Sequence, residues 1–174
     1  MSDQPTYPWY LTVRGDGLEQ GDVLPGFEIV VPKAGASAGA EQIDLDFLIC
    51  DVVVMTQTCD IQNHKVDSVL LCPWWDLWQF IEAAQSGGKN WGRDLRDALR
   101  KGNMPGYHLL NSTFQDGLEL GLGIVDFHSV YTAPVARIRE HAERLGNRLR
   151  LCPPYREEKG ALPGLGAEIQ LWVV

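Results

Sequence analysis

Two apolar runs separated by a short polar break constrain the fold of this chain more than any other feature. Residues 52–55 are Val-Val-Val-Met, and a second apolar run follows at 66–72 after the polar break at 61–65. Dense β-branched residues favour strands, and two strands joined by a short connection pair antiparallel. The sequence therefore predicts a hairpin in which residues 51–58 pair with 66–72 and alternate residues of 52–55 are wholly buried.

Strand patterns continue along most of the chain. The runs with strand character are 9–13, 27–31, 43–57, 66–72, 124–131 and 147–152. After Pro73 the apolar residues recur at helical spacing instead, which predicts helices at about 75–86 and 91–101. We therefore expect an α+β fold, in which five to seven antiparallel strands form a partly closed β-barrel with a helical hairpin inserted at about 74–103.

Composition and length indicate an ordinary globular domain. The chain has 174 residues, of which 45% are hydrophobic and 22% charged, and one domain spanning 1–174 is expected at this length. No apolar run approaches the roughly 18 residues that cross a bilayer. The stretch 1–5 lacks the basic flank and apolar core of a secretory signal. We expect a cytoplasmic protein that does not contact membranes.

The charge is negative overall but unevenly distributed. The net charge is −8, which argues against general nucleic-acid binding, because phosphate contacts need a basic surface. Two segments, 89–101 and 137–150, each carry a local charge of +3. They are interpreted either as solvated helical faces or as anion-facing patches. If nucleic acid is bound at all, the first segment would bind it through Arg93, Arg96 and Arg100.

A polar cluster follows the first strand of the predicted hairpin. It consists of Thr58, Cys59, Asp60 and His64. Cys59 could act as a nucleophile if His64, across the turn, lowered its pKa, although the adjacent carboxylate of Asp60 disfavours a thiolate. Asp60 has an alternative role in bonding to the backbone of the turn. Cys59, Asp60 and His64 are thus the candidate catalytic residues.

The same cluster suggests a metal site as a second hypothesis. Zinc binds Cys, His and Asp side chains in a tetrahedral shell. The available ligands are Cys59, Asp60, His64, His108, Asp126 and His128. A set of Cys59, His64 and His128 forms only if the 124–131 strand lies beside the hairpin. Asp126 and His128, two apart on that strand, would project from the same face.

The chain resembles a group of uncharacterised bacterial and phage-associated proteins. The shared features are an early Gly-Asp, a strand ending in Thr/Ser-Gln-x-Cys-Asp and a later Val-Asp strand. Here they are Gly21-Asp22, Thr56-Gln57-Thr58-Cys59-Asp60 and Val125-Asp126, and together the match covers about a third of the chain. This resemblance implies no activity.

A second resemblance is to the small SH3-like barrels of MazF/PemK-type toxins. The order of Gly21-Asp22-Val23, residues 52–55 and residues 69–73 is similar to theirs. It implies an SH3-like barrel and, by analogy, endoribonuclease activity. In those toxins an Arg-Pro before the third strand and a Thr or Ser near the end of the fourth carry RNA cleavage. The matching positions here lie near Asp51 and Trp74, so both groups are missing.

Three functional hypotheses follow. The first is a binding or regulatory domain with a polar Cys-Asp site at a strand end, whose partner is a protein or a small molecule. The second is a hydrolase that depends on Cys59 or on a bound zinc ion. The third is a MazF-like endoribonuclease that lacks the usual Arg and Thr/Ser.

Overall fold

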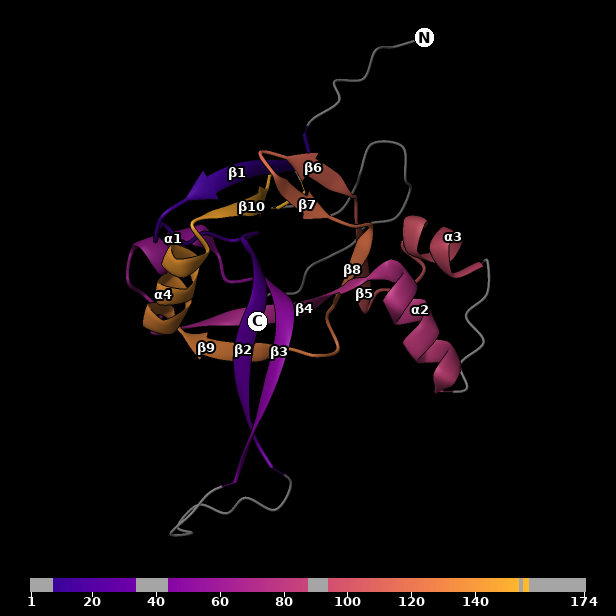
Figure 1. Ribbon diagram of the computed structural model, residues 1–174, viewed down its shortest axis with the longest axis horizontal. Helices are drawn as coiled ribbons and strands as arrows, with labels where there is room; N and C mark the ends of the chain where they lie inside the picture. Colours follow the sequence, from indigo (N-terminus) through magenta and orange to yellow (C-terminus); the bar gives the residue numbers. More distant parts are fainter. Residues whose placement is uncertain (1–7, 34–43, 88–93, 154, 157–174) are drawn as a thin grey trace.

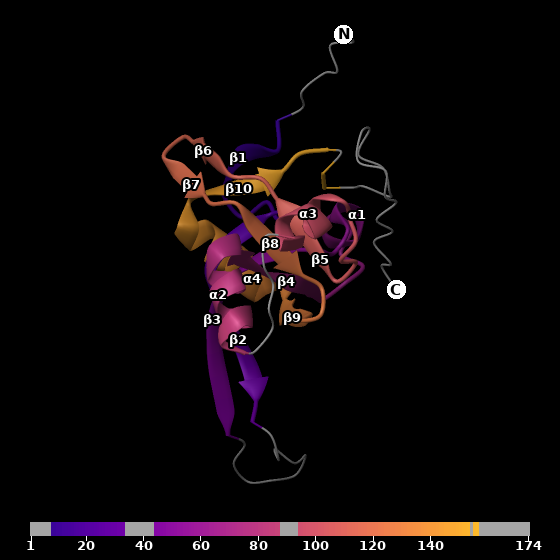
Figure 2. The same ribbon diagram turned by 90° about the vertical axis from the view of Figure 1, so that its right-hand side faces the viewer.

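Antiparallel strands are the main secondary structure of the protein, whose computed structural model describes residues 8–33, 44–87, 94–153 and 155–156 (Figures 1 and 2). The strands are β1 (Tyr10–Arg14), β2 (Val23–Pro32), β3 (Leu45–Val54), β4 (Ser68–Asp76), β5 (Tyr107–Leu110), β6 (Thr113–Gln115), β7 (Leu118–Leu120), β8 (Gly123–Asp126), β9 (Tyr131–Pro134) and β10 (Asn147–Leu151). The helices are α1 (Thr58–Gln62), α2 (Leu77–Ser86), α3 (Asp94–Arg100) and α4 (Val135–Leu145). The predicted α+β class with antiparallel strands is confirmed.

The main sheet is organised around β4. Its strand order is β2-β3-β4-β8-β5, and β9 also pairs with β4. Two smaller sheets, β1-β10 and β6-β7, complete the described strands. These strands do not join into a closed barrel, so the predicted SH3-like barrel is not confirmed. Figure 1 shows α1 and α4 at one end of the molecule and α2 and α3 at the other.

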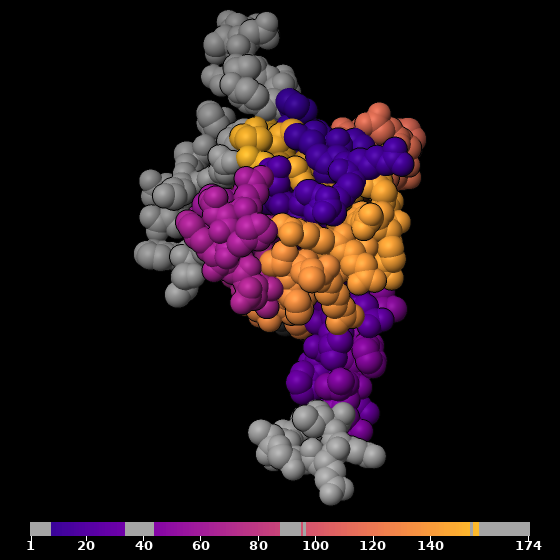
Figure 3. Space-filling model, turned by 90° about the vertical axis from the view of Figure 1, so that its left-hand side faces the viewer, coloured from indigo at the N-terminus to yellow at the C-terminus, as the bar shows by residue number. Residues whose placement is uncertain are grey.

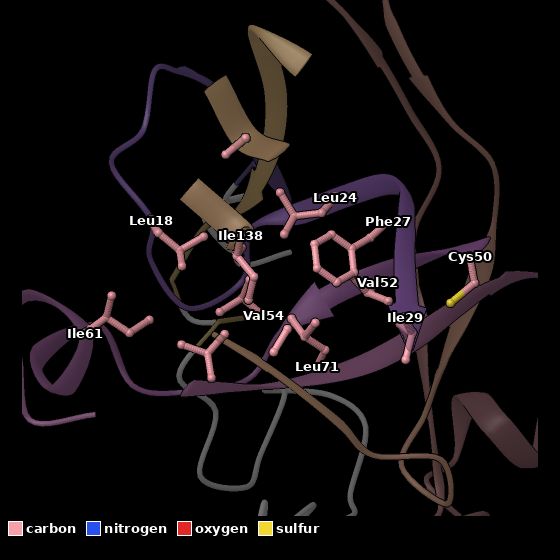
Figure 4. Packing of buried hydrophobic residues seen from close by; sticks show 13 residues of the cluster. Leu18, Leu24, Phe27, Ile29, Cys50, Val52, Val54, Ile61, Leu71 and Ile138 are labelled. Atoms are coloured by element: carbon pink, nitrogen blue, oxygen red, sulfur yellow. The ribbon is translucent and has the colours of Figure 1, made fainter. Parts of the chain in front are cut away.

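The predicted pairing of the two apolar runs is confirmed. β3 and β4 run antiparallel, with Val53 opposite Cys72 and Val54 opposite Leu71. Val52 and Val54 belong to one buried cluster and Val53 to another on the opposite face, as Figure 4 shows for the first cluster. Because both faces of this strand are covered, its apolar residues are consecutive and do not alternate with polar ones.

The helical insertion begins later than predicted. β4 continues through Pro73 and Trp74 to Asp76, and only then does α2 start. The Asp76 carboxylate caps α2, since its Oδ1 accepts hydrogen bonds from the backbone N–H of Trp78 (2.9 Å) and Gln79 (3.2 Å). Trp74 is therefore a buried strand residue rather than the first residue of a helix. The start of the second predicted helix, 91–93, lies outside the described residues.

The predicted strand at 124–131 is two strands joined by a turn. β8 ends at Asp126 and pairs with β5, whereas β9 begins at Tyr131 and pairs with β4. The Asp126 carboxylate holds the turn by accepting hydrogen bonds from the His128 backbone (2.9 Å) and the Ser129 hydroxyl (3.1 Å). A carboxylate that bonds two residues ahead in this way competes with strand pairing.

Beyond the body of the molecule, β2 and β3 continue as a two-stranded ribbon (Figures 1 and 3). Their pairing extends to Pro32 and Leu45. Leu45, Phe47 and Ile49 of this ribbon are exposed. In the described part of the chain, no helix has the length and apolar character needed to cross a membrane.

Candidate functional site

The segment that follows β3 is a short helix rather than a hairpin turn. Residues Thr58–Gln62 form α1, and Ile61 is buried against the core cluster (Figure 4). The Thr56 hydroxyl accepts a hydrogen bond from the Leu70 backbone at 2.7 Å. Burial of Ile61 and this bond hold the segment against β4, and α1 leaves Cys59 and Gln62 exposed.

The predicted catalytic group is not assembled within the described residues. Cys59 is exposed, and the polar atoms near its Sγ are Gln57 Oε1 at 3.6 Å and Asp60 Oδ1 at 3.7 Å. Asp60 forms an ion pair with Lys65 (3.2 Å), which differs from the predicted bond to the turn backbone. His64 is exposed with a positive φ of 54°. No hydrogen bond joins His64 to Cys59 here, so the pairing of nucleophile and base is absent.

The predicted zinc ligands are likewise not brought together. Within the described ranges, no group of three or more His, Cys, Asp or Glu side chains is arranged to hold a metal ion. Cys59 lies on α1 and His64 just after it, whereas His128 follows β8, which pairs with β4 and β5. The physical reason is the turn at Asp126, which takes His128 out of the strand.

Asp126 and His128 contact each other rather than a shared site beside Cys59. Nδ1 of His128 lies 3.1 Å from Oδ1 of Asp126. The imidazole packs over Gly106, where a Cβ atom would lie only 1.7 Å from Cε1 of His128. Its ring is also tilted against Tyr107 with centroids 4.7 Å apart. This pair therefore fixes the turn between β8 and β9 and needs glycine at position 106.

A cavity of about 40 Å³ lies where β3 ends. Its walls are largely apolar and are provided by Val53, Met55, Leu110, Val125, Phe127 and Leu151. Four residues with polar side chains, Gln20, His108, Tyr155 and Arg156, also line it. The predicted site residues Cys59, Asp60, His64 and His128 are not among the residues that line this cavity.

His108 reaches the cavity from β5. It pairs with Val125 of β8, and strand alternation places it on the same face as Leu110, which also lines the cavity. Burial lowers the pKa of His108 below its usual value, so the imidazole is neutral at pH 7. A neutral imidazole offers one hydrogen-bond donor and one acceptor.

Arg156 borders the cavity from the C-terminal side. Its Nη1 donates a hydrogen bond to Glu19 Oε2 at 3.0 Å. Its aliphatic stem crosses Gly21, where a Cβ atom would lie 3.1 Å from Cγ of Arg156 and 3.0 Å from Cβ of Leu151. Gly21 also has a φ of +84°, which strongly favours glycine. Both close approach and backbone conformation therefore require glycine at position 21.

A buried network of ion pairs lies next to the residues Gln20 and Gly21 that line the cavity. The Asp22 carboxylate accepts hydrogen bonds from both Arg148 and Arg150. Arg148 also donates to the carbonyls of Gly15 and Gly17, each at 2.6 Å. Every polar atom of this carboxylate and the two guanidinium groups thereby gains partners that replace water.

Glu19 joins the buried network to the cavity. Its carboxylate pairs with Arg150 at 2.8 Å and with Arg156 at 3.0 Å. Burial by itself lowers the pKa of Arg150, but hydrogen bonds and charge from Asp22 and Glu19 outweigh that effect and raise it. The Gln20 backbone in turn donates to the Thr58 hydroxyl (3.1 Å). The loop at 19–22 therefore touches the network, the cavity and α1.

Two basic residues of the second segment are buried in a strand. Arg148 and Arg150 lie in β10, which matches the strand predicted at 147–152, but both are buried, so the interpretation of 137–150 as a solvated helical face is wrong for them. The alternation Arg148-Leu149-Arg150-Leu151 contained the signal, because it places two arginines on one face of a strand that must be matched by a carboxylate. Of the other basic segment, Arg100 is exposed near Asp97 (4.0 Å), while Arg93 and the Arg96 side chain lie outside the described structure.

Comparison with known proteins gives no match: no family model, curated protein or solved structure is significantly similar to this chain.

Proposed function

We propose that the chain is a binding or regulatory domain whose ligand enters the cavity at the end of β3. The observation that carries this proposal is the chemistry of the lining: apolar walls with a neutral imidazole and a guanidinium at their margin. A few polar groups placed in an apolar concavity are typical of ligand sites, because the walls supply affinity and the polar groups fix orientation.

The size of the cavity limits what can enter it. By the same measure of volume, one water molecule needs roughly 10–15 Å³, so 40 Å³ accommodates about three groups of that size. A branched three-carbon group fits this space. The remainder of a larger ligand would lie outside, towards the loop at 19–22 and α1, which carries the predicted Cys59 and Asp60.

Binding is favoured over hydrolysis by the surroundings of Cys59. The groups closest to its thiol are an amide oxygen and a carboxylate, and neither would stabilise a thiolate nucleophile. The cavity, in contrast, contains polar groups suited to hold a ligand in one orientation. We therefore place Cys59 and Asp60 at the rim of a binding site rather than at a reaction centre.

Nuclear magnetic resonance titration with two isopropyl compounds, isobutyrate and isobutyramide, tests the proposal. At least one should shift the backbone amide signals of Met55, Leu110 and Val125 in a saturable manner. The variant Val125→Ile, which adds one methylene at the cavity wall, should weaken that binding. Val130→Ile, at an exposed position, is the matched control. If neither compound perturbs the cavity residues, the proposal is wrong.

A further inference from the structure

We infer that the chain forms a symmetric dimer in which the outer part of β3 pairs antiparallel with the same segment of a second copy. The pairing is centred on Phe47, so that Leu45 of one copy lies opposite Ile49 of the other. The two ribbons thereby join into one four-stranded sheet. This inference does not depend on the cavity or its ligand.

The outer part of β3 has an open edge. β4 pairs with residues 51–54 of β3, and its following residues pair with β8. Within the described residues, no strand pairs with 45–50 on that side, whereas β2 covers the opposite edge. Figures 1 and 3 show the ribbon projecting clear of the body of the molecule. A strand of a second copy can therefore approach this edge.

The backbone groups at the open edge belong to the odd-numbered residues. In an antiparallel ladder, residues that exchange hydrogen bonds with one neighbouring strand alternate with residues that do not. The Asp44 carbonyl accepts a hydrogen bond from the Lys33 backbone at 3.0 Å, so the even-numbered residues of this stretch face β2. Leu45, Phe47 and Ile49 therefore each offer one donor and one acceptor to a strand at the open edge.

The outer part of β3 lacks the features that usually protect an exposed edge. Proline, lysine and β-bulges keep edge strands from pairing with other chains. β2 contains two prolines and a register shift near its start, whereas residues 45–50 contain neither proline nor lysine and no register shift. The side chains of Leu45, Phe47 and Ile49 are also exposed. Apolar side chains beside open backbone groups favour the addition of another strand.

Charge and the course of β4 favour one register over its neighbours. With Phe47 opposite Phe47, Asp46 lies opposite Leu48, and apolar residues lie opposite apolar residues on the exposed face. A two-fold axis at Asp46 would place two carboxylates directly opposite each other, which is destabilising. An axis at Leu48 would place Leu45 opposite Asp51, whose edge β4 already occupies. The segment is therefore complementary to itself when it is centred on Phe47.

Disulfide cross-linking of the full chain tests the surface and the register together. All variants carry Cys59→Ser, which removes the exposed thiol. Directly opposite residues have Cα atoms about 5.5 Å apart, within the range of a disulfide. Under air oxidation, Phe47→Cys should therefore form an intermolecular disulfide at least about tenfold faster than Leu45→Cys alone. A mixture of Leu45→Cys and Ile49→Cys should cross-link as fast as Phe47→Cys. Equal rates for Phe47→Cys and Leu45→Cys alone would overturn the inference.

Sedimentation equilibrium measures the association itself. The wild-type chain should form dimers, and Phe47→Lys should raise their dissociation constant at least about tenfold, because it places two cations opposite each other. Val130→Lys, at an exposed position outside the ribbon, is the matched control and should leave the constant unchanged. Phe47 is 62% exposed, so the variant should keep the circular dichroism spectrum of the wild type.

The failures of this test are specific. A wild-type chain that stays monomeric at about 1 mM would show that the interface does not exist. A dimer that persists unchanged in Phe47→Lys uses a different surface. In a monomeric chain, slow hydrogen exchange of the Leu45, Phe47 and Ile49 amides would show that another segment of the same chain covers the edge. Each of these results overturns the inference, and if Phe47→Lys does not fold, the cross-linking rates still decide it.

Discussion

Nη2 of Arg148 lies 3.0 Å from Oδ2 of Asp22, and both side chains are completely buried. Asp22 also accepts hydrogen bonds from Arg150, so one carboxylate compensates two guanidinium groups. A buried charge that loses its partner is strongly destabilising, because no water replaces the lost contact. The early Gly-Asp of the sequence therefore supports the fold as well as the cavity.

The first prediction concerns this carboxylate. Asp22→Asn should lower the free energy of unfolding by about 3–5 kcal/mol, since it leaves the buried Arg148 without an anion and removes one of the two carboxylates that pair with Arg150. Urea denaturation followed by circular dichroism measures the change. Asp16→Asn, an exposed position in the preceding loop, should change stability by less than about 0.5 kcal/mol. Equal stability of the two variants would show that the network does not hold the structure together.

The second prediction concerns β3. Val54→Asp should lower the free energy of unfolding by about 4 kcal/mol or more, because it buries a carboxylate among the apolar side chains of this cluster. Val130→Asp, at an exposed position, is the control and should hardly change the free energy of unfolding. The double variant Val53→Asp, Val54→Asp should not fold. A folded double variant, with wild-type circular dichroism and amide spectra, contradicts the assignment of β3 as a central strand.

The third prediction concerns His108 and pH. Its pKa is lower in the folded protein than the usual value of about 6.5 expected for the unfolded chain. Below pH 6.5 the unfolded state therefore binds more protons, and stability falls as the pH decreases towards the folded-state pKa. His108→Gln should lose less stability than the wild type between pH 7.5 and 5 in urea titrations. If the stability of His108→Gln follows the same pH dependence as that of the wild type, the lowered pKa of His108 is contradicted.

The fourth prediction concerns the four thiols. Burial raises the pKa of Cys72 to about 12 and also raises those of Cys50 and Cys152. In the native protein at pH 8, an aromatic disulfide reagent should therefore modify one thiol rapidly, that of the exposed Cys59. Cys59→Ser should remove the rapid phase, and Cys72→Ser should not. Rapid modification of two or more thiols in the folded protein is incompatible with this burial.

The consecutive valines of β3 were enough to predict the central hairpin, because a run with no polar interruption indicates a strand covered on both faces. The sequence could not show that β4 passes through Pro73 to Asp76, since Trp74 fits both a strand and the apolar period of α2. Pairing with Asp51 and Val125 decides this, and that is a long-range contact.

The candidate site was harder to predict than the hairpin. The sequence predicted that a strand ends at Thr58, Cys59 and Asp60. These residues instead form part of α1, in which Ile61 is buried. His108 and Arg156 are far apart in the chain and share no motif, so only the pairing of β5 with β8 and the glycine at position 21 bring them to one cavity. The lining of the cavity therefore depends on tertiary structure, which a local sequence motif does not show.

The most direct test of the cavity as a binding site is an intermolecular nuclear Overhauser measurement between isobutyrate methyl protons and protein methyl groups. The account predicts contacts with the methyl groups of Leu110 and Val125, and none with those of Val52 or Ile138 in the separate cluster on the other face of β3. Contacts confined to other parts of the protein, or none at all at saturating isobutyrate, would contradict it.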